Sequence, residues 1–271
     1  MNSLISPLCY QPARHLWKLM RDDHYRTGCL LDWRFRNTKR FIPVETQLHG
    51  WSVKAPDAAS LVSTYKQLFV DRIYDFRFKN DAPKILDLGA NIGLSILRFK
   101  KLFPKAKITA FEADPEIFKY LEENIRRNGI EDVDLRNQAA WYENTTLRFF
   151  QEGADGGHIA TGGDSKGVDV PAVNLADLLQ KESFDFLKMD IEGAEEIVLP
   201  ICRDYLNGVS YIFVEYHSRL TEPQRLHEIM DILAKAGFRI HVQGHSTANS
   251  PFLSKPTHAG FDLQLNIFGN R

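Results

Sequence analysis

The sequence predicts an α/β fold built on a doubly wound, mostly parallel sheet. From Lys84 onward, short apolar runs alternate with segments of helical periodicity, and this alternation is typical of repeated βα units. The runs are apolar at successive positions, as expected for strands that helices cover on both faces. Composition agrees, because 44% of the 271 residues are hydrophobic and 25% are charged, which suits a globular chain with a sizeable core.

The first part of the chain, residues 1–56, predicts a small appended extension that holds three of the four tryptophans. Alternating basic residues over 34–40 predict a strand with one basic face. We expect a larger domain over residues 57–271. It should begin with a helix over 57–76, capped by Asp57.

Two βα units open the predicted sheet. A strand over 84–89 precedes a helix whose apolar residues recur at steps of four and three, and Pro104 ends that helix. A second strand over 107–114 leads into a helix that begins at the pair Asp114–Pro115, a favourable cap and first turn. The pair Asn128–Gly129 predicts the end of this helix.

The remaining strands follow as further apolar runs. We expect them over 133–140, 184–191, 209–216, 238–242 and 261–268, with the last two paired at the sheet edge. An insertion over 148–173 predicts two short strands around a glycine-rich loop, which we interpret either as a lid or as a plain surface loop.

Two more helices lie between these strands. One should open at Gly193 and be shortened or kinked by Pro200. Thr221 and Gln224 form a predicted capping box for the other, which should end at Gly237.

A glycine turn follows the strand over 84–89, in the order Asp87-Leu88-Gly89-Ala90-Asn91-Ile92-Gly93. In an open α/β sheet such a turn lies at the carboxyl edge, where a nucleotide can approach the backbone and the start of the next helix. A dinucleotide fingerprint would need a glycine where Asn91 stands, and a carboxylate at Asp87 would repel phosphate but attract a cation. These features favour S-adenosyl-L-methionine, with Glu112, 25 positions after Asp87, accepting hydrogen bonds from the ribose hydroxyls.

Charged and titratable side chains gather near the ends of the strands predicted over 184–191 and 209–216. They are Lys188, Asp190, Glu192, Glu215 and His217. Methyl transfer to oxygen is helped by a base that takes the hydroxyl proton, and Asp190, Glu215 and His217 are the candidates. Asp190 could instead contact the cofactor or cap the next helix, and His217 could be a hydrogen-bonded core histidine. The same donors could hold a divalent cation, but no tight ligand spacing supports one, so we expect no metal.

Four stretches of the sequence resemble the FkbM-type methyltransferases, a branch of the class I S-adenosylmethionine-dependent enzymes. They read ILDLGANIG, AFEADPEIF, LKMDIEGAE and FVEYH, and LKMDIEGAE is the most specific. The resemblance covers about residues 65–268. It implies a seven-stranded sheet with an antiparallel last strand, and transfer of a methyl group from S-adenosyl-L-methionine, usually to a hydroxyl oxygen.

The same resemblance implies which residues form the site. The glycine turn would surround the methionyl part of the cofactor, Glu112 would take the ribose, and Gln138 with Ala139 and Ala140 would lie beside the adenine. The expected cofactor-binding residues are Asp87, Gly89, Ala90, Asn91, Gly93, Glu112, Ala113, Gln138, Ala139 and Asp190. The expected catalytic residues are Asp190, Glu215 and His217.

The charge balance and the chain's first residues limit its partners and location. With 34 basic and 35 acidic side chains, the net charge of −1 gives no general attraction for nucleic acid. No apolar run approaches the ~20 residues of a membrane span. The first residues lack the basic start and apolar stretch of a secretory signal, so we expect a cytoplasmic protein. The expected partner is a small-molecule or glycan hydroxyl acceptor, and an oligomer is left open.

Three other functions fit parts of the pattern. A nicotinamide-dependent oxidoreductase would share the sheet, but the middle glycine of its fingerprint is missing. A non-catalytic cofactor-binding protein would keep the fold without turnover, although the acids and His217 at the strand ends argue against it. An RNA methyltransferase is disfavoured by the neutral charge and by the lack of an N-P-P-Y-like motif.

Overall fold

The computed structural model describes residues 7–150, 158–159, 167–248, 250–254, 257 and 260–271. The chain divides into two compact units, residues 1–75 and residues 76–271. The domain boundary predicted after residue 56 lies before this division and stays a prediction.

The first unit contains helices and one β-hairpin. They are α1 (Pro7–Arg21), α2 (Asp23–Phe35), β1 (Val44–Leu48), β2 (Trp51–Ala55), α3 (Ala58–Tyr65) and the π-helical segment η1 (Lys66–Val70). The strand predicted over 34–40 is wrong, because the basic residues there belong to the end of α2 and the turns that follow it. Asp57 caps α3 as predicted, since its carboxylate accepts a hydrogen bond from the Ser60 N–H at 2.9 Å.

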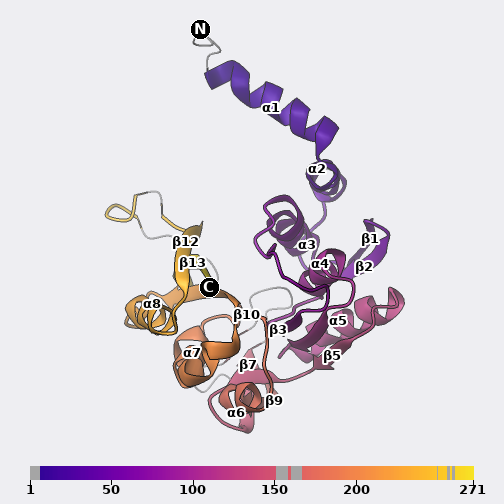
Figure 1. The fold of residues 1–271 in the computed structure, drawn as a ribbon. Helices are drawn as coiled ribbons and strands as arrows, with labels where there is room; N and C mark the ends of the chain where they lie inside the picture. The colour runs from indigo at the N-terminus through magenta and orange to yellow at the C-terminus, as the bar shows by residue number, and fades with distance from the viewer. Residues whose placement is uncertain (1–6, 151–157, 160–166, 249, 255–256, 258–259) are drawn as a thin grey trace. The chain divides into compact units, whose positions relative to one another are not determined.

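The second unit is built on a seven-stranded sheet in the order β12-β13-β11-β10-β3-β4-β5 (Figure 1). Its strands are β3 (Lys84–Leu88), β4 (Lys107–Phe111), β5 (Val133–Arg136), β10 (Phe186–Met189), β11 (Tyr211–Arg219), β12 (Arg239–Ser246) and β13 (Phe261–Asn270). Neighbours from β11 to β5 pair in parallel, whereas β13 is antiparallel to both β11 and β12. This arrangement confirms the predicted α/β fold, including the antiparallel last strand.

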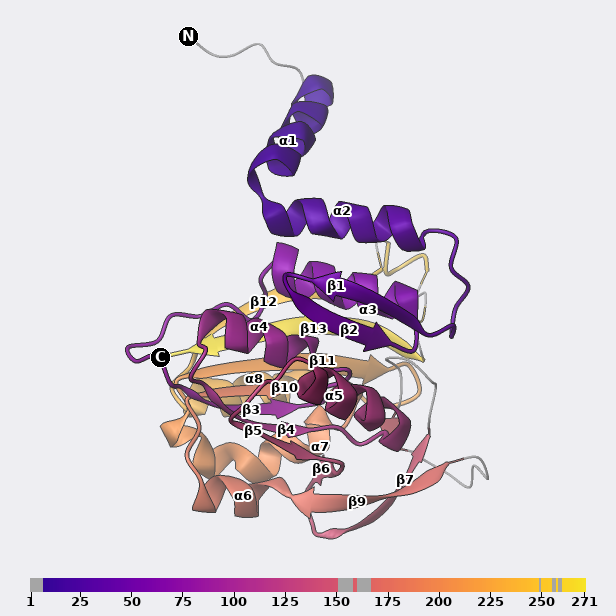
Figure 2. The ribbon, with the colours of Figure 1, turned by 90° about the vertical axis from the view of Figure 1, so that its right-hand side faces the viewer.

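Helices cover both faces of this sheet (Figures 1 and 2). One face carries α4 (Leu94–Leu102) and α5 (Pro115–Arg127), and the other carries α6 (Leu175–Lys181), α7 (Glu195–Cys202) and α8 (Leu226–Lys235). Asp114 caps α5, and α7 is a short helix with Pro200 in its last turn, both as predicted. The capping box at Thr221 and Gln224 is wrong. Instead, α8 begins after Arg225, whose backbone N–H donates to Glu196 at 3.0 Å.

A smaller four-stranded sheet follows β5, in the order β6-β9-β7-β8. Its strands are β6 (Ala139–Trp141), β7 (Thr145–Phe150), β8 (His158–Ile159) and β9 (Val168–Asn174). The single strand predicted over 133–140 is therefore two strands. Asn137 separates them, because its side-chain amide donates to the carbonyl oxygens of Glu112 and Ala113 at 2.9 and 3.2 Å. The short strands predicted in the insertion are present, but most of the loop interpreted as a lid lies outside the described residues.

The order of the strands creates a switch point between β3 and β10. From β3 the chain winds outward through β4 and β5, and then returns to place β10 on the other side of β3. At such a point the loops after neighbouring strands diverge and leave room for a ligand at the carboxyl edge. The glycine turn after β3 and the acidic residues after β10 meet at this edge.

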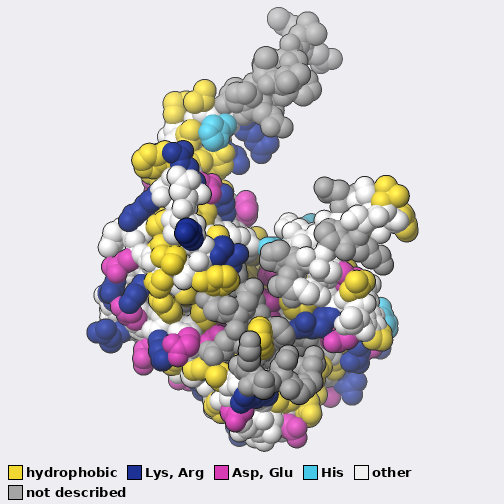
Figure 3. Space-filling view, turned by 180° about the vertical axis from the view of Figure 1, so that it is seen from behind, with side chains coloured by type: hydrophobic (Ala, Val, Ile, Leu, Met, Phe, Trp, Pro, Cys, Tyr) yellow, Lys and Arg dark blue, Asp and Glu magenta, His cyan; other side chains and the backbone are white. Residues whose placement is uncertain are grey.

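The surface shows no segregation of charge by sign on the face drawn in Figure 3, where basic and acidic side chains are interspersed. Among helices of the described residues, none combines the length and apolar character needed to cross a bilayer.

Candidate active site

The turn after β3 has a backbone that only particular residues can adopt. Gly89 and Gly93 have φ of +80° and +92°, and Asn91 lies at 49°. A Cβ atom on Gly89 would lie 1.8 Å from the Asp190 carbonyl oxygen, so this position requires glycine both for its φ and for its close contact with the strand β10 end. The N–H groups of Gly89 and Ala90 donate to the Phe111 carbonyl oxygen at 3.0 and 2.8 Å, which ties the turn to the end of β4.

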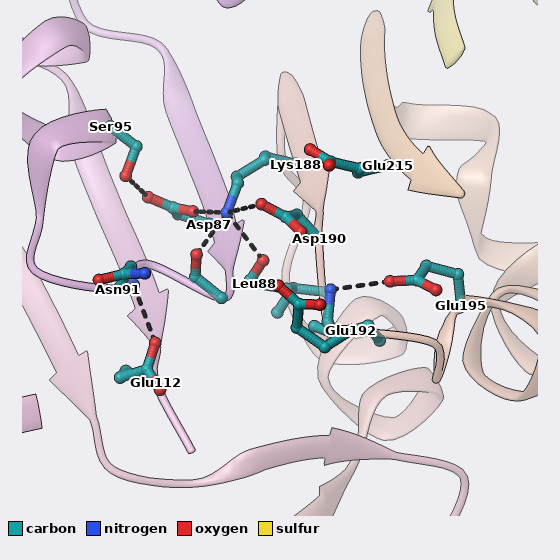
Figure 4. Close-up of polar contacts among 12 residues, drawn as sticks. Asp87, Leu88, Asn91, Ser95, Glu112, Lys188, Asp190, Glu192, Glu195 and Glu215 are labelled. Carbon is teal, nitrogen blue, oxygen red and sulfur yellow. Dashed lines mark hydrogen bonds and ion pairs between the residues drawn. The ribbon is translucent and has the colours of Figure 1, made fainter. Parts of the chain in front are cut away.

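Glu112 follows β4 and faces this turn (Figure 4). Its Oε2 accepts a hydrogen bond from the Asn91 N–H at 2.8 Å, and its Oε1 accepts one from the Asp114 N–H at 2.9 Å. Burial disfavours the charged carboxylate more than these two N–H groups favour it, and the pKa of Glu112 is raised to about 7. Each carboxylate oxygen can accept a further hydrogen bond.

Lys188 connects the two sides of the switch point. Its Nζ lies 3.3 Å from Asp87 Oδ1 and 3.5 Å from Asp190 Oδ2, and it donates to the carbonyl oxygens of Leu88 and Gly89 (Figure 4). Burial opposes the charged ammonium, but the two carboxylates outweigh it and raise the pKa of Lys188. Lys188 is therefore a buried cation that joins β3 to β10.

Asp87 is fully buried, and its Oδ2 accepts a hydrogen bond from the Ser95 hydroxyl at 2.6 Å. From the sequence, Asp87 was expected to attract a cation. In the structure Lys188 already supplies that positive charge from within the chain. Asp87 thus acts on the turn through Lys188 and Ser95.

His217 on β11 is held by the loop after β10. Glu195 accepts hydrogen bonds from the N–H groups of Ile191 and Gly193 at 2.9 and 3.0 Å, and its Oε1 lies 3.2 Å from His217 Nδ1. Burial alone would lower the pKa of His217, but Glu195 and Glu192 raise it well above 6.5. The raised pKa favours the imidazolium form, in which both ring nitrogens donate hydrogen bonds, over the neutral base expected from the ordinary pKa of histidine.

Three carboxylates surround the other side of the imidazole. His217 Nε2 lies 3.5 Å from Glu192 Oε2 and 3.7 Å from Glu215 Oε1. One ligand atom each of Asp190, Glu192 and His217 lies within 4.8 Å of the others, a spacing that a cation could bridge. Burial and the neighbouring Asp190 charge raise the pKa of Glu215 to about 8, and burial raises that of Glu192 well above 4.5. The site can therefore take up or release a proton near neutral pH.

The structure brings most of the predicted residues to one edge of the sheet. Ala90 lies within the turn, Ala113 follows Glu112, and Gln138 with Ala139 lies where the chain passes from β5 to β6. Asn137, which holds this last segment against the end of β4, was not predicted from the sequence, and neither was the role of Glu195. The sequence did contain a signal for Glu195, because it lies two residues after Gly193. A carboxylate at that spacing can accept hydrogen bonds from the N–H groups of the preceding loop.

Comparisons with known proteins agree with this architecture. A family model described as the methyltransferase FkbM domain matches residues 87–240, more than half of the 271 residues. Methyltransferase sdnD of Sordaria araneosa is 31% identical over 189 residues, which cover 56% of this chain and 73% of that protein. The 2-O-methyltransferase NoeI of Sinorhizobium fredii (strain NBRC 101917 / NGR234) is 29% identical over 176 residues, covering 56% of this chain and 71% of that protein.

One solved structure shows the same fold. The crystal structure of methyltransferase FkbM from Methylobacillus flagellatus KT has a TM-score of 0.50 at 15% identity, and it covers 78% of this chain. This chain spans about half of that protein, since 53% of the solved chain is matched. Together with the family model and the relatives, these findings confirm what the four sequence stretches predicted. The chain belongs to the FkbM methyltransferase family.

Proposed function

We propose that this methyltransferase uses S-adenosyl-L-methionine and methylates a hydroxyl oxygen of a sugar unit or another small hydroxylated metabolite. The observation that carries the proposal is the position of Glu112, whose carboxylate faces the glycine turn at 2.8 Å from the Asn91 N–H. A carboxylate at this place suits a nucleoside with free ribose hydroxyls, because each of its oxygens can accept one more hydrogen bond.

The described residues fit the cofactor on chemical grounds. When bound, it would supply an electrophilic methyl group on a positively charged sulfur. Asp190, which follows β10 and whose backbone packs against Gly89, would place a carboxylate near the turn, where it would stabilise a cation. Glu112 would hold the ribose, and the segment fixed by Asn137 would lie beside the adenine.

Positioning is the larger part of catalysis in such a transfer. Methyl transfer is an in-line displacement, and holding the two reactants in line can contribute about 7–11 kcal/mol. Lys188 fixes the ends of β3 and β10 relative to each other, so the cofactor turn and the acceptor groups share one rigid frame.

The proton of the attacking hydroxyl would pass to a carboxylate. Asp190 is 24% exposed at its side chain and lies 3.5 Å from Lys188 Nζ, and Glu215 has its pKa raised to about 8. His217, held by Glu195, has its Nε2 3.7 Å from Glu215 Oε1 and would orient that carboxyl group. We therefore assign the base to Asp190 or Glu215, with His217 as the group that positions Glu215.

The name of one relative supports oxygen as the acceptor atom, since it is called a 2-O-methyltransferase. The test is transfer of a labelled methyl group from S-adenosyl-L-methionine to a panel of hydroxylated compounds, with the product analysed by mass spectrometry. We expect a methyl ether. Asp190→Asn should lower the rate by about 10²-fold or more. A product methylated only on nitrogen or carbon would contradict the proposal.

A further inference from the structure

One face of the strands β11, β13 and β12 carries a row of polar side chains. The register pairs Glu215 with Asn266, and Asn266 with Gln243. It also pairs His217 with Gln264. Directly paired residues of antiparallel strands project to the same face, so these five side chains form one polar row. We call it the polar ladder.

The opposite face of the same strands is apolar. Tyr216 and Ile267 belong to the main hydrophobic cluster, and Leu263 and Leu265 pack against it. The cluster includes residues of α7 and α8, which cover that face. The polar ladder therefore lies on the face turned away from these helices.

Four of the five side chains of the polar ladder are buried, whereas Gln243, on the strand β12, is exposed. Glu215, His217, Gln264 and Asn266 are only 7%, 3%, 7% and 5% exposed. Buried amides normally have their hydrogen bonds satisfied. Yet Asn266 Oδ1 is fully buried and has no hydrogen-bond donor among the described residues. A buried acceptor atom without a hydrogen bond lowers the stability of the fold. Such costs are typical of side chains whose partner is a bound ligand.

The orphan acceptor stands next to the groups that handle the reactive hydroxyl. Asn266 is directly opposite Glu215, and Glu215 is in turn 3.7 Å from His217 Nε2. At this register the Cβ atoms of the pair are about 5 Å apart. A ring that presents one hydroxyl to Glu215 can therefore reach the Asn266 amide with the next.

We propose that the polar ladder binds the acceptor, and that the acceptor is a polyhydroxylated ring such as a glycosyl unit. A second hydroxyl, adjacent to the one that is methylated, donates to Asn266 Oδ1, and the amides of Gln264 and Gln243 contact the substituents beyond it. This inference rests on the proposed methyl transfer to oxygen. An alcohol with a single hydroxyl, or a phenol, would leave the buried Asn266 amide unpaired and be rejected.

The first experiment compares acceptors on the whole protein. Labelled methyl transfer is measured with methyl glycosides of pentoses, hexoses, 6-deoxyhexoses and N-acetylhexosamines, and with cyclohexanol and phenol as single-hydroxyl controls. We expect transfer to at least one glycoside, and a loss of roughly tenfold or more in kcat/KM when the hydroxyl next to the methylated one is absent. Transfer confined to cyclohexanol or phenol, or no transfer to any glycoside by protein that binds S-adenosylhomocysteine, would overturn the inference. Protein that neither binds S-adenosylhomocysteine nor transfers methyl would instead contradict the proposed function itself.

The second experiment replaces the orphan amide by an isosteric apolar side chain. Asn266→Leu should raise KM for the glycoside roughly tenfold, leave the affinity for S-adenosylhomocysteine unchanged, and keep or raise the Tm, because a buried unpaired acceptor is removed. Asn270→Leu is the matched control, since Asn270 lies on the same strand but is exposed and at its far end. A lower Tm with unchanged KM in Asn266→Leu would show that the amide is only structural and would overturn the inference.

Discussion

Replacing Lys188 by methionine tests whether this buried cation holds the switch point together. Methionine has a similar length and no charge, so Lys188→Met removes the positive charge and the hydrogen bonds to Leu88 and Gly89 with little change in volume. What remains is the Asp87 carboxylate, which is fully buried and keeps one hydrogen bond, from Ser95 at 2.6 Å.

The expected loss is large because a buried carboxylate would be left without its partner. Removing one member of a buried ion pair costs about 3–5 kcal/mol, a large part of the about 5–15 kcal/mol by which a domain is stable. Adding Asp87→Asn to Lys188→Met should recover most of the loss.

The assay is unfolding in guanidinium chloride at neutral pH, for the two single variants and the double variant. Lys100→Met is the matched control. Lys100 is also buried, but its ammonium donates to the Ala106 carbonyl oxygen at 2.6 Å and is not paired with a buried carboxylate, so the loss should be about 1 kcal/mol. A loss below about 1 kcal/mol for Lys188→Met, or the same loss with and without Asp87→Asn, would refute the reasoning.

Three further predictions concern titratable groups. Because the pKa of Glu112 is about 7 and the ribose hydroxyls should favour its ionised form, the affinity for S-adenosylhomocysteine should rise as pH increases through 7, as followed by calorimetry. The raised pKa of His217 means that its imidazolium stabilises the fold below pH 6.5, and this contribution should be lost as pH rises through the raised value. The difference in unfolding midpoint between wild type and His217→Gln should therefore shrink in alkali. A difference that stays constant with pH would contradict a stabilising role of the imidazolium. Asp57→Ala should lower the free energy of unfolding of the first unit by about 1–2 kcal/mol, measured by thermal unfolding, because it removes the cap of α3. The difference between wild type and variant should vanish in acid, because the pKa of Asp57 is lowered below 3.8 and its stabilising contribution is lost as pH falls through that lowered value.

The periodicity of the sequence was sufficient for the sheet and its helices, because strands buried on both faces leave a signal that does not depend on their neighbours. The same holds for Glu112, which the spacing alone places at the end of the strand after the glycine turn. The strand predicted from alternating charge over 34–40 was wrong, since a helix end followed by turns can carry the same pattern as an exposed strand. The capping box predicted at Thr221 and Gln224 was wrong because the backbone N–H of Arg225, at the start of α8, donates to the distant Glu196 carboxylate instead.

The contacts between site residues that could not be predicted from the sequence depend on strand order. Asp87 and Lys188 are 101 positions apart, and they meet only because β10 returns to lie beside β3 with Asp87 opposite Lys188. The pKa of His217 could not be predicted from residue type either. The pKa of His217 is raised by Glu195, which is the first residue of α7. The Glu195 carboxylate reaches His217 only because α7 begins at this residue.

The affinity for S-adenosylhomocysteine tests the central claim most directly. Calorimetric titration of the wild type, of Glu112→Gln and of the control Glu116→Gln separates the proposed ribose contact from a general loss of charge, because Glu116 is exposed and pairs with Lys119 at 2.6 Å. Binding by the wild type and Glu116→Gln, with a loss of roughly tenfold or more for Glu112→Gln, is the predicted result. A wild type that gives no binding heat, or a Glu112→Gln variant that binds as tightly as the wild type, would contradict the account.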